Sequence, residues 1–378
     1  MKKSRGSSNS GLRSPEPGLE QKASSSKAPT QKPQPNVMMR IHYASRNTSG
    51  YITEQTKESI LRVAVPMNEK FNITGVLICV KDMFFQIIEG PKQHLEMLFE
   101  NIMRDPRHCN ITKLDSTLFQ DEAERMFPAW YMKQLDGMSW SSDDLTSRAG
   151  KFKVQDAYCA LKNMIATVLA SEYLKQASSY NISMSKEDAY YVMMVDFMHY
   201  KKFLYHLHQI EGGYQLLVKF VGNMLEMIKR HDGKHIMLME SSILILFEKD
   251  IPDHALSVAV KLLENLDSFR KNVNREEMEA FYCNIGITKA LLNYKKLTSL
   301  NNCISKVSRL QNAADSCAYC VVFDECVFDS VGLNSAWKSQ NLLKKIVTEE
   351  EEVAFTIVND KNIKVSKEEM MELLNRLH

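Results

Sequence analysis

The stretch from 75 to 90, GVLICVKDMFFQIIEG, limits the possible folds more than any other segment. Two apolar runs, VLICV and MFFQII, flank Lys81-Asp82, and this pattern predicts two strands joined by a tight turn. Gln86 interrupts the second run. Burying an amide without a hydrogen-bond partner costs about 1–3 kcal/mol. The hairpin therefore requires a polar partner for Gln86.

The segments around this hairpin predict a split βαβ unit. The order strand, helix, strand, strand, helix, strand is typical of a ferredoxin-like sheet, which helices cover on one face. A ligand between the two helices of such a unit meets side chains of the sheet. The predicted strands are 38–45, 75–80, 83–88 and 111–119, and the predicted helices are 53–70 and 94–104.

A second unit of the same kind follows from residue 189. Its longer pattern ends with a further helix and strand, so the fold class is α+β, with two ferredoxin-like α/β sandwich domains. A long helix is expected over 199–231, with a possible break at Gly212-Gly213. The other expected elements are strands 189–197, 235–239, 242–247, 281–287 and 319–323 and helices 254–271 and 302–314.

Composition divides the chain into five parts. The Ser-, Pro- and Lys-rich N-terminal segment is expected to be a disordered tail, and the polar segment after the first unit is expected to be a linker that contains a helix over 151–178. The predicted parts are tail 1–36, first domain 37–136, linker 137–188, second domain 189–332 and C-terminal extension 333–378.

Charge and cysteine usage exclude several classes of function. Residues 1–36 hold seven basic and two acidic residues, which leaves 41 basic and 44 acidic residues in the rest of the chain, so nucleic-acid binding by the folded part is not expected. No apolar run reaches the roughly 18 residues that a membrane span needs. Eight scattered cysteines indicate a reducing, cytoplasmic setting, and the single Cys317–Cys320 CxxC pair is interpreted as structural rather than as a redox or zinc motif.

Several polar residues of the first domain have no simple structural explanation. Tyr43 lies in the first predicted strand, Asn68 ends the first helix, and the segments DPRH (105–108) and FPAWYM (127–132) follow later elements. Taken singly, each has an ordinary alternative, such as a helix cap for Asn68. Together with Gln86 they suit a planar heteroaromatic ligand that carries carbonyl groups and ring nitrogens.

These residues resemble the motifs of the BLUF family, the blue-light sensors that use flavin. The resemblance covers residues 38–136. Its elements, in sequence order, are Tyr43 and Ser45, then Asn68 ahead of ITG, then Gln86 in FFQIIEG, then Asp105, Arg107 and His108 in DPRH, and finally Trp130 and Met132 in FPAWYM.

The resemblance implies a flavin between the two helices, FAD or alternatively FMN or riboflavin. It implies that Gln86 links Tyr43 to the flavin, that Asn68 binds the ring edge, and that Asp105, Arg107 and His108 line the pocket. Light would then rearrange the Gln86 amide after electron and proton transfer from Tyr43. Trp130 and Met132 would relay the change.

The first domain also departs from the family pattern at two positions. Ala64 and Asn101 stand where the family often has a serine and a basic residue, respectively. Both changes remove a polar contact with the expected flavin. Weaker flavin binding or a changed photocycle rate is expected, whereas the relay through Tyr43 and Gln86 keeps both of its residues.

The second domain resembles class III nucleotide cyclases, to which some BLUF domains are fused. Asp196 stands at the first metal-ligand position and Arg309 at the phosphate-binding arginine. Two carboxylates are needed to hold two divalent ions against a triphosphate. The second metal position falls on Ser241, beside Glu240. The remaining expected residues are replaced by Met237, Lys296, Ser305, Lys289, Leu291 and Leu292.

The sequence therefore predicts a blue-light receptor with an inactive, cyclase-like output domain that forms a homodimer. A heteromer with an intact cyclase or another signalling protein remains an alternative. A working light-regulated adenylyl or guanylyl cyclase is a second alternative, and a flavin-free interaction protein is a third.

Overall fold

The computed structural model of the chain describes residues 37–120, 122–135, 142–180, 188–239, 241–247, 251–293, 295–348 and 352–377. The predicted disorder of residues 1–36 lies outside this range. Within the described residues the structure contains both helices and strands, arranged around two sheets, as the sequence predicts. In this part of the chain no helix is long and apolar enough to cross a membrane.

The first sheet has five strands in the order β4-β1-β3-β2-β5. Two helices connect them, α1 (Glu54–Lys70) and α2 (Lys92–Arg104). The strands are β1 (Met38–Asn47), β2 (Thr74–Val80), β3 (Met83–Pro91), β4 (His108–Phe119) and β5 (Trp130–Gln134). Strand β5 is not among the strands that the sequence predicts. It runs parallel to β2, with Trp130 opposite Gly75.

The hairpin of β2 and β3 forms as predicted. Val80 pairs with Met83 across the turn, and Lys81 adopts a left-handed φ of 53°. The turn is secured by Asp82, whose carboxylate accepts hydrogen bonds from the Arg46 guanidinium at 2.9 and 2.6 Å. Gly75 begins this hairpin at a point of close backbone approach, because a Cβ there would lie 2.1 Å from the Ile87 carbonyl oxygen.

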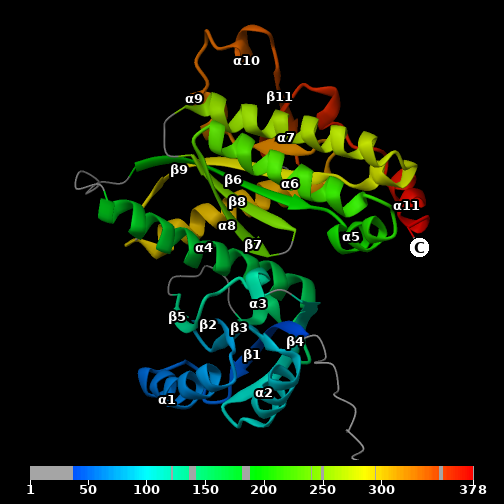
Figure 1. Cartoon of the computed structure of the whole chain (residues 1–378). Coiled ribbons are helices and arrows are strands. Elements are labelled where there is room, and N and C mark those ends of the chain that lie inside the picture. The colour runs from blue at the N-terminus through cyan, green and yellow to red at the C-terminus, as the bar shows by residue number, and fades with distance from the viewer. Residues whose placement is uncertain are drawn as a thin grey trace, which may run out of the picture. The chain divides into compact units, whose positions relative to one another are not determined.

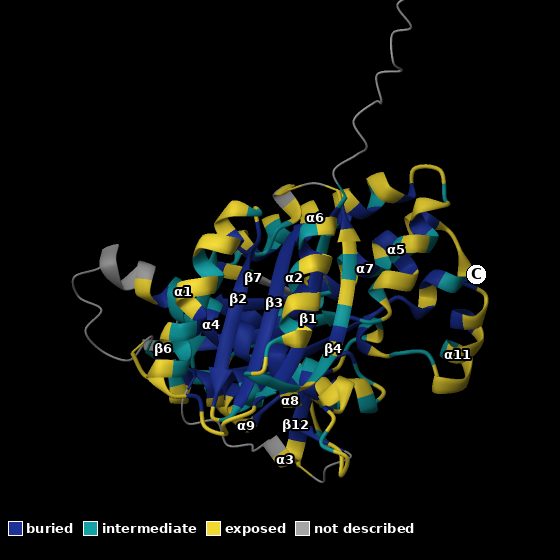
Figure 2. Ribbon diagram, turned by 90° about the horizontal axis from the view of Figure 1, so that it is seen from below, coloured by how far each residue is buried: buried dark blue, intermediate teal, exposed yellow. Residues whose placement is uncertain are grey.

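Helices cover the first sheet on both faces. Helices α1 and α2 lie over the face that carries Ile41, Tyr43 and Ile88. The opposite face, with Val76 and Ile87, packs against helix α4 (Val154–Tyr180). The expectation of helices on one face was therefore incomplete, because the connecting helix covers the other. Figure 2 shows the central strands β1, β2 and β3 buried beneath these layers.

The second sheet has seven strands in the order β11-β12-β10-β9-β6-β8-β7. The strands are β6 (Asp188–Phe197), β7 (Gly233–Met239), β8 (Ser242–Phe247), β9 (Cys283–Leu292), β10 (Val321–Phe323), β11 (Leu343–Val347) and β12 (Val353–Ile357). The segment expected as a C-terminal extension thus contributes β11 and β12, which join the sheet beside β10.

The helix expected over 199–231 is two helices. Helix α5 (Tyr200–His208) ends before Gly212, and α6 (Gly213–Arg230) begins directly after it. Gly212 has a φ of 73°, and a Cβ on Gly213 would lie 2.4 Å from the Leu207 carbonyl oxygen, so both glycines are needed for the break. The remaining helices include α7 (Pro252–Val273), α8 (Leu297–Ser316) and α11 (Lys367–Asn375), with short helices α3 (Ser142–Leu145), α9 (Glu325–Ser330) and α10 (Ala336–Ser339).

Helix α4 contributes to the cores of both sheets. Its residues Leu161 and Ile165 pack on the first sheet, whereas Ala170 and Leu174 pack with β6, β8 and α8 of the second. The helix therefore has apolar residues on opposite sides, which explains why its sequence shows mixed spacing rather than one amphipathic stripe.

Candidate functional site

A cavity opens between α1 and α2, on the face of the first sheet that these two helices cover. It holds about 740 Å³ of space not filled by protein atoms, a figure that includes the open solvent at its mouth. Seven of the eight BLUF-motif residues assigned to cofactor binding or relay line it, namely Tyr43, Asn68, Gln86, Asp105, Arg107, His108 and Trp130. The apolar lining includes Ile60, Val63, Met67, Leu77, Leu98 and Ile102.

The partner of Gln86 is Tyr43. The two residues are directly opposite on β3 and β1, so both side chains point to the cavity face. The Tyr43 hydroxyl donates a hydrogen bond to the Gln86 side-chain oxygen. Tyr43 is completely buried and Gln86 is 5% exposed. The amide that interrupts the apolar strand is thus paired at the floor of the cavity.

Burial also fixes the protonation of Tyr43. Loss of solvation, reinforced by the nearby Asp105 carboxylate, raises the pKa of the Tyr43 phenol far above its usual value. Phe99 of α2 contacts the ring edge-on, with centroids 5.5 Å apart. Tyr43 is therefore a neutral hydrogen-bond donor at every physiological pH.

Two polar atoms in the cavity wall are buried and have no hydrogen-bond partner among the described residues. These are the Asn68 side-chain oxygen, on a residue 2% exposed, and the Trp130 indole nitrogen. Buried polar atoms are rarely left unpaired, because each costs about 1–3 kcal/mol. Their position on the cavity wall indicates a ligand with its own donors and acceptors.

The segment after α2 places a fixed charge pair at the cavity. Arg107 Nε donates to both Asp105 carboxylate oxygens, at 2.9 and 3.0 Å, and Arg107 Nη1 reaches Ser59 of α1 at 3.1 Å. Burial alone would raise the pKa of Asp105, but the hydrogen bonds from Arg107 lower it below the usual value. The pair therefore stays ionised and links the end of α2 to the first half of α1.

His108, the first residue of β4, contacts Ser45 of β1. Its Nδ1 lies 2.8 Å from the Ser45 hydroxyl, so two separate elements of the sequence motif meet here. Burial lowers the pKa of His108 to about 4. The imidazole is consequently neutral near pH 7 and presents one donor and one acceptor.

The structure places Met132 outside the cavity lining. It lies on β5 opposite Leu77 and is partly buried in a cluster with Cys79 and Phe84. Ala64 and Asn101, which depart from the family pattern, both line the cavity.

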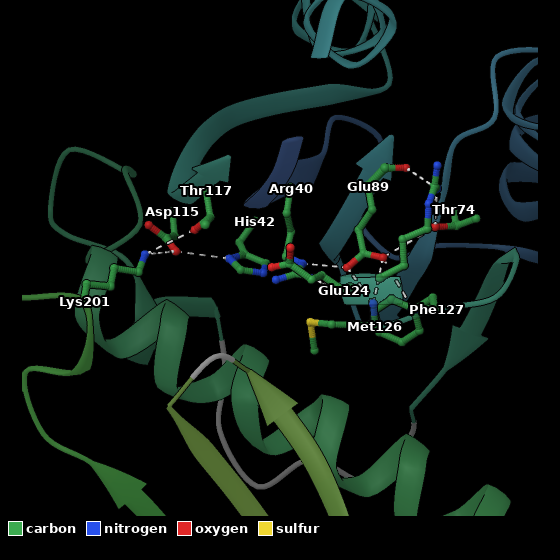
Figure 3. Close-up of polar contacts among 11 residues, drawn as sticks. Arg40, His42, Thr74, Glu89, Asp115, Thr117, Glu124, Met126, Phe127 and Lys201 are labelled. Atoms are coloured by element: carbon green, nitrogen blue, oxygen red, sulfur yellow. Dashed lines mark hydrogen bonds and ion pairs between the residues drawn. The ribbon is translucent and has the colours of Figure 1, made fainter. Parts of the chain in front are cut away.

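The opposite face of the first sheet carries a polar network that was not predicted from the sequence (Figure 3). Glu89 is completely buried and its carboxylate accepts a hydrogen bond from Arg40 Nε at 2.6 Å. On the same face Asp115 lies 3.6 Å from His42 and 2.7 Å from Lys201. Glu89 could have been found by the argument used for Gln86, since it also interrupts the apolar run FFQIIEG.

In the second domain Asp196 is the next-to-last residue of β6, and other side chains of the chain already contact it. Its carboxylate accepts hydrogen bonds from Lys162 of α4 at 3.1 Å, from Ser241 at 2.9 Å and from Ser242 at 2.5 Å. Lys162 is only 6% exposed. It was not predicted as a site residue, because it stands in the apolar context ALKNMIA of the linker helix.

Arg309 is exposed on α8. It lines a cleft between α4 and α8, together with Asn163, Ser305 and Asn312. Glu240 lies outside the described residues, as does the side chain of Met237. Among the described residues no cluster of three or more His, Cys, Asp or Glu side chains is arranged to hold a metal ion. The thiols of Cys317 and Cys320 are both free.

Comparison with known proteins supports the resemblance predicted for the first domain. Residues 38–133 match the BLUF family, described as sensors of blue-light using FAD. Photoactivated adenylate cyclase subunit beta of Euglena longa is 34% identical over 89 residues, which are 22% of this chain and 10% of that protein. The blue light- and temperature-regulated antirepressor BluF of Escherichia coli K12 is 37% identical over 57 residues, 15% of this chain and 14% of that protein. The chain therefore aligns with only a small part of each relative.

Solved structures show similarity over different lengths. The photo-activated state of BlsA is 34% identical in sequence to the matched part of this chain. The match covers 26% of this chain and 69% of BlsA, with a TM-score of 0.23. A bacterial light-regulated adenylyl cyclase covers 90% of this chain and 99% of that chain at 18% identity, with a TM-score of 0.41. The match at residues 38–133 is thus to a family whose domains bind flavin.

The cavity fits such a cofactor. An isoalloxazine ring needs an apolar slot with polar groups along one edge, and the slot between α1 and α2 supplies apolar walls together with the unpaired Asn68 and Trp130 atoms. Neutral His108 and the ionised Asp105–Arg107 pair add further polar groups at the rim.

Proposed function

We propose that the BLUF domain at residues 38–133 acts as a blue-light switch, in which the Tyr43–Gln86 hydrogen bond is the switching element. The observation that carries this proposal is a buried phenol–amide hydrogen bond at the floor of a cavity whose other polar atoms lack partners. A purely structural role for the Tyr43–Gln86 hydrogen bond would not explain why the Asn68 oxygen and the Trp130 nitrogen beside it lack hydrogen-bond partners.

The cavity residues have distinct proposed roles. Asn68 binds the polar edge of the flavin ring, and the Asp105–Arg107 pair with His108 closes the rim. FAD is the expected form, with FMN or riboflavin as alternatives that the same ring contacts accept. When bound, the flavin supplies absorption of blue light and an acceptor for one electron.

Tyr43 and Gln86 carry the steps after light absorption. Tyr43 is the buried side chain that donates a hydrogen bond to Gln86, and it keeps its proton because of its raised pKa. If Tyr43 gave one electron to a bound flavin, its phenol would also release its proton, which the Gln86 oxygen could accept along their hydrogen bond. Electron and proton would both return to Tyr43 when the flavin is reoxidised. The amide of Gln86 then adopts a different hydrogen-bond arrangement.

The free energy of the switch is small. Exchanging one hydrogen bond is worth about 0.5–1.5 kcal/mol, which biases a nearly balanced equilibrium without unfolding a domain. We propose Trp130 and Met132 on β5 as the residues that respond to the rearranged Gln86 amide. Trp130 lines the cavity, and Met132 lies opposite Leu77 on β2.

For the second domain we propose a cyclase-like, ferredoxin-like fold that serves as a dimerising output and not as an enzyme. The strand order β9-β6-β8-β7 supports the fold. The engagement of Asp196 by Lys162 and two serines supports the loss of catalysis, because a lysine ammonium already lies against the carboxylate that a divalent ion would need. A cytoplasmic homodimer, or a heteromer with an intact cyclase or another signalling protein, is the expected assembly.

One absorption experiment tests the photoreceptor proposal. Purified full-length protein is expected to be yellow, to release flavin on heating, and to shift its absorption to longer wavelength after blue light. A colourless protein that takes up no added FAD, FMN or riboflavin would support the flavin-free interaction protein instead.

A nucleotide assay tests the output domain. Incubation with ATP or GTP and Mg²⁺ or Mn²⁺, in darkness and in blue light, is expected to yield no cyclic nucleotide. A product that depends on light would favour the active photoactivated cyclase.

A further inference from the structure

Gln86 and Glu89 lie on the same strand but face opposite sides of the first sheet. Side chains alternate along a strand, so Gln86 reaches the cavity while Glu89 points to the opposite, helix α4 side. Any displacement of β3 at Gln86 therefore also moves a carboxylate on the far face. Glu89 is completely buried, so this carboxylate has no access to water.

The Glu89 carboxylate holds the segment that leads into β5 (Figure 3). It accepts hydrogen bonds from the backbone amide of Met126, with both oxygens at 3.0 Å, and from that of Phe127 at 3.4 Å. Arg40 joins the same network, because its Nε bonds Glu89 and its Nη2 donates to the Glu124 carbonyl at 2.6 Å.

A second arginine ties this segment to β2 and β3. Arg125 Nη1 donates to the Thr74 hydroxyl at 2.9 Å and to the Glu89 carbonyl at 3.3 Å. Residues 124–127 are thereby held by side chains and backbone of β1, β2 and β3 at once. Trp130, which lines the cavity, follows three residues after this segment.

The segment and β5 in turn contact helix α4. Met126 and Tyr131 pack against the apolar cluster that includes Leu161 and Ile165 of α4. Lys133 of β5 makes an ion pair with Glu172 of α4 at 2.6 Å. A continuous set of contacts thus runs from β3 through Glu89 to β5 and α4.

We propose that Glu89 is a positioning residue that couples the state of Gln86 to the position of β5 and α4, with Arg40 as its supporting partner. The inference rests on the proposed photoreceptor function. Glu89 has the chemistry for this role, since a buried carboxylate accepts several backbone amides at once with charge-assisted strength. A displacement of β3 is then transmitted to residues 124–134 as a rigid connection.

The test compares darkness and blue light by hydrogen exchange of the backbone amides in the full-length, flavin-loaded chain. The wild type is expected to show a light-dependent change of exchange in residues 124–134. Glu89→Gln keeps the shape but removes the charge and one acceptor oxygen. It is expected to keep the flavin and its red shift, and to reduce the light-dependent exchange change by about fivefold.

Arg40→Met/Glu89→Leu is the second variant, because it leaves no unpaired buried charge. It is expected to reproduce the uncoupling of Glu89→Gln with less loss of stability. Asp115→Asn is the matched control, since Asp115 lies on the same face and pairs with His42 and Lys201 rather than with residues 124–127. The control is expected to keep the wild-type exchange change.

Each outcome decides between a coupling role and a structural one. A red shift in the wild type without any exchange change at 124–134 overturns the coupling while leaving the photoreceptor proposal intact. A Glu89→Gln protein with the full exchange change, or a control that loses it equally, also overturns it. Loss of flavin from both Glu89 variants would show that the residue is structural only. Absence of any shift in the wild type refutes the photoreceptor proposal itself.

Discussion

The two sheets differ in whether the polar side chains at their candidate sites have partners within the chain. In the first, Tyr43 and Gln86 pair at the floor of an open cavity, and neighbouring polar atoms lack partners. In the second, Asp196 at the end of a central strand is met by Lys162 from α4. One site is left for a ligand and the other is filled by the chain. The difference shows that an available site is recognised by its unpaired atoms and not by its polar residues alone.

The largest expected effect comes from filling the first site. Ala64→Trp inserts an indole into the cavity that Ala64 lines. A side chain of the protein would then occupy the first site, as Lys162 already occupies the second. Flavin affinity is expected to fall by more than about 100-fold, since the ring and the indole compete for the same volume. Titration of flavin fluorescence measures this. Ala64→Ser, which adds only a hydroxyl, is the control and should bind as the wild type or more tightly.

The next effect is the part of the pH dependence of stability that His108 of the first domain contributes. Burial lowers the pKa of His108 to about 4, below the value of about 6.5 expected for the unfolded chain. The unfolded state therefore binds a proton that the folded state does not, and stability is lost as pH falls from about 6.5 to 4. The loss amounts to at most about 3 kcal/mol.

Urea unfolding across this pH range measures the loss. In His108→Gln this part of the pH dependence should disappear. His94→Gln, on α2 against Phe71, is the matched control and should keep it. A His108→Gln protein with the wild-type slope would contradict the assignment.

A smaller effect, on the free energy of unfolding, is expected when Lys162 is removed from the second site. Lys162→Met removes the cation that faces Asp196, while the two serine hydroxyls remain. Removing one partner of a buried pair leaves an uncompensated charge, and with these hydroxyls present a loss of about 2 kcal/mol in the free energy of unfolding is expected. The double variant Lys162→Met/Asp196→Asn removes both charges and should lose less. Equal losses would show that the ion pair is not what stabilises this region.

The smallest change in free energy should have the clearest optical result. Gln86→Leu should retain the fold and the flavin, with stability changed by no more than about 1.5 kcal/mol, yet abolish the red shift. Tyr43→Phe should act in the same way by removing the donor. Absorption difference spectra before and after blue light provide the measurement. A shift of normal size in Gln86→Leu would refute the proposed switch.

Local pattern was sufficient for the elements with strong periodicity. The hairpin at Lys81-Asp82, helix α1 and the hairpin of β7 and β8 lie close to their predicted positions. Strand β5 was missed because its five residues are all half-buried and show no alternation of apolar and polar side chains. Its strand form depends on parallel pairing with β2, which is a tertiary contact.

In the candidate site, too, some residues could be found from local sequence pattern and others depend on tertiary contacts. Tyr43 and Gln86 were selected because an amide in an apolar strand demands a partner, and β1 pairs with β3 in the register that supplies it. Lys162 could not be connected to Asp196 from sequence, because the contact joins the linker helix to a strand of another sheet. The contacts of Glu89 with Met126 and Phe127 likewise depend on where the chain returns after β4.

Helix α4 has a consequence for how such a protein is divided or recombined. Because Leu161 and Ile165 complete one hydrophobic core and Ala170 and Leu174 another, no cut on either side of this helix yields two finished modules. Whichever half loses the helix exposes an apolar surface that invites aggregation. Fusing the first domain to another protein would therefore require keeping the helix and supplying a matching apolar surface on that protein, and thermal melting should show the two halves unfolding in a single cooperative transition.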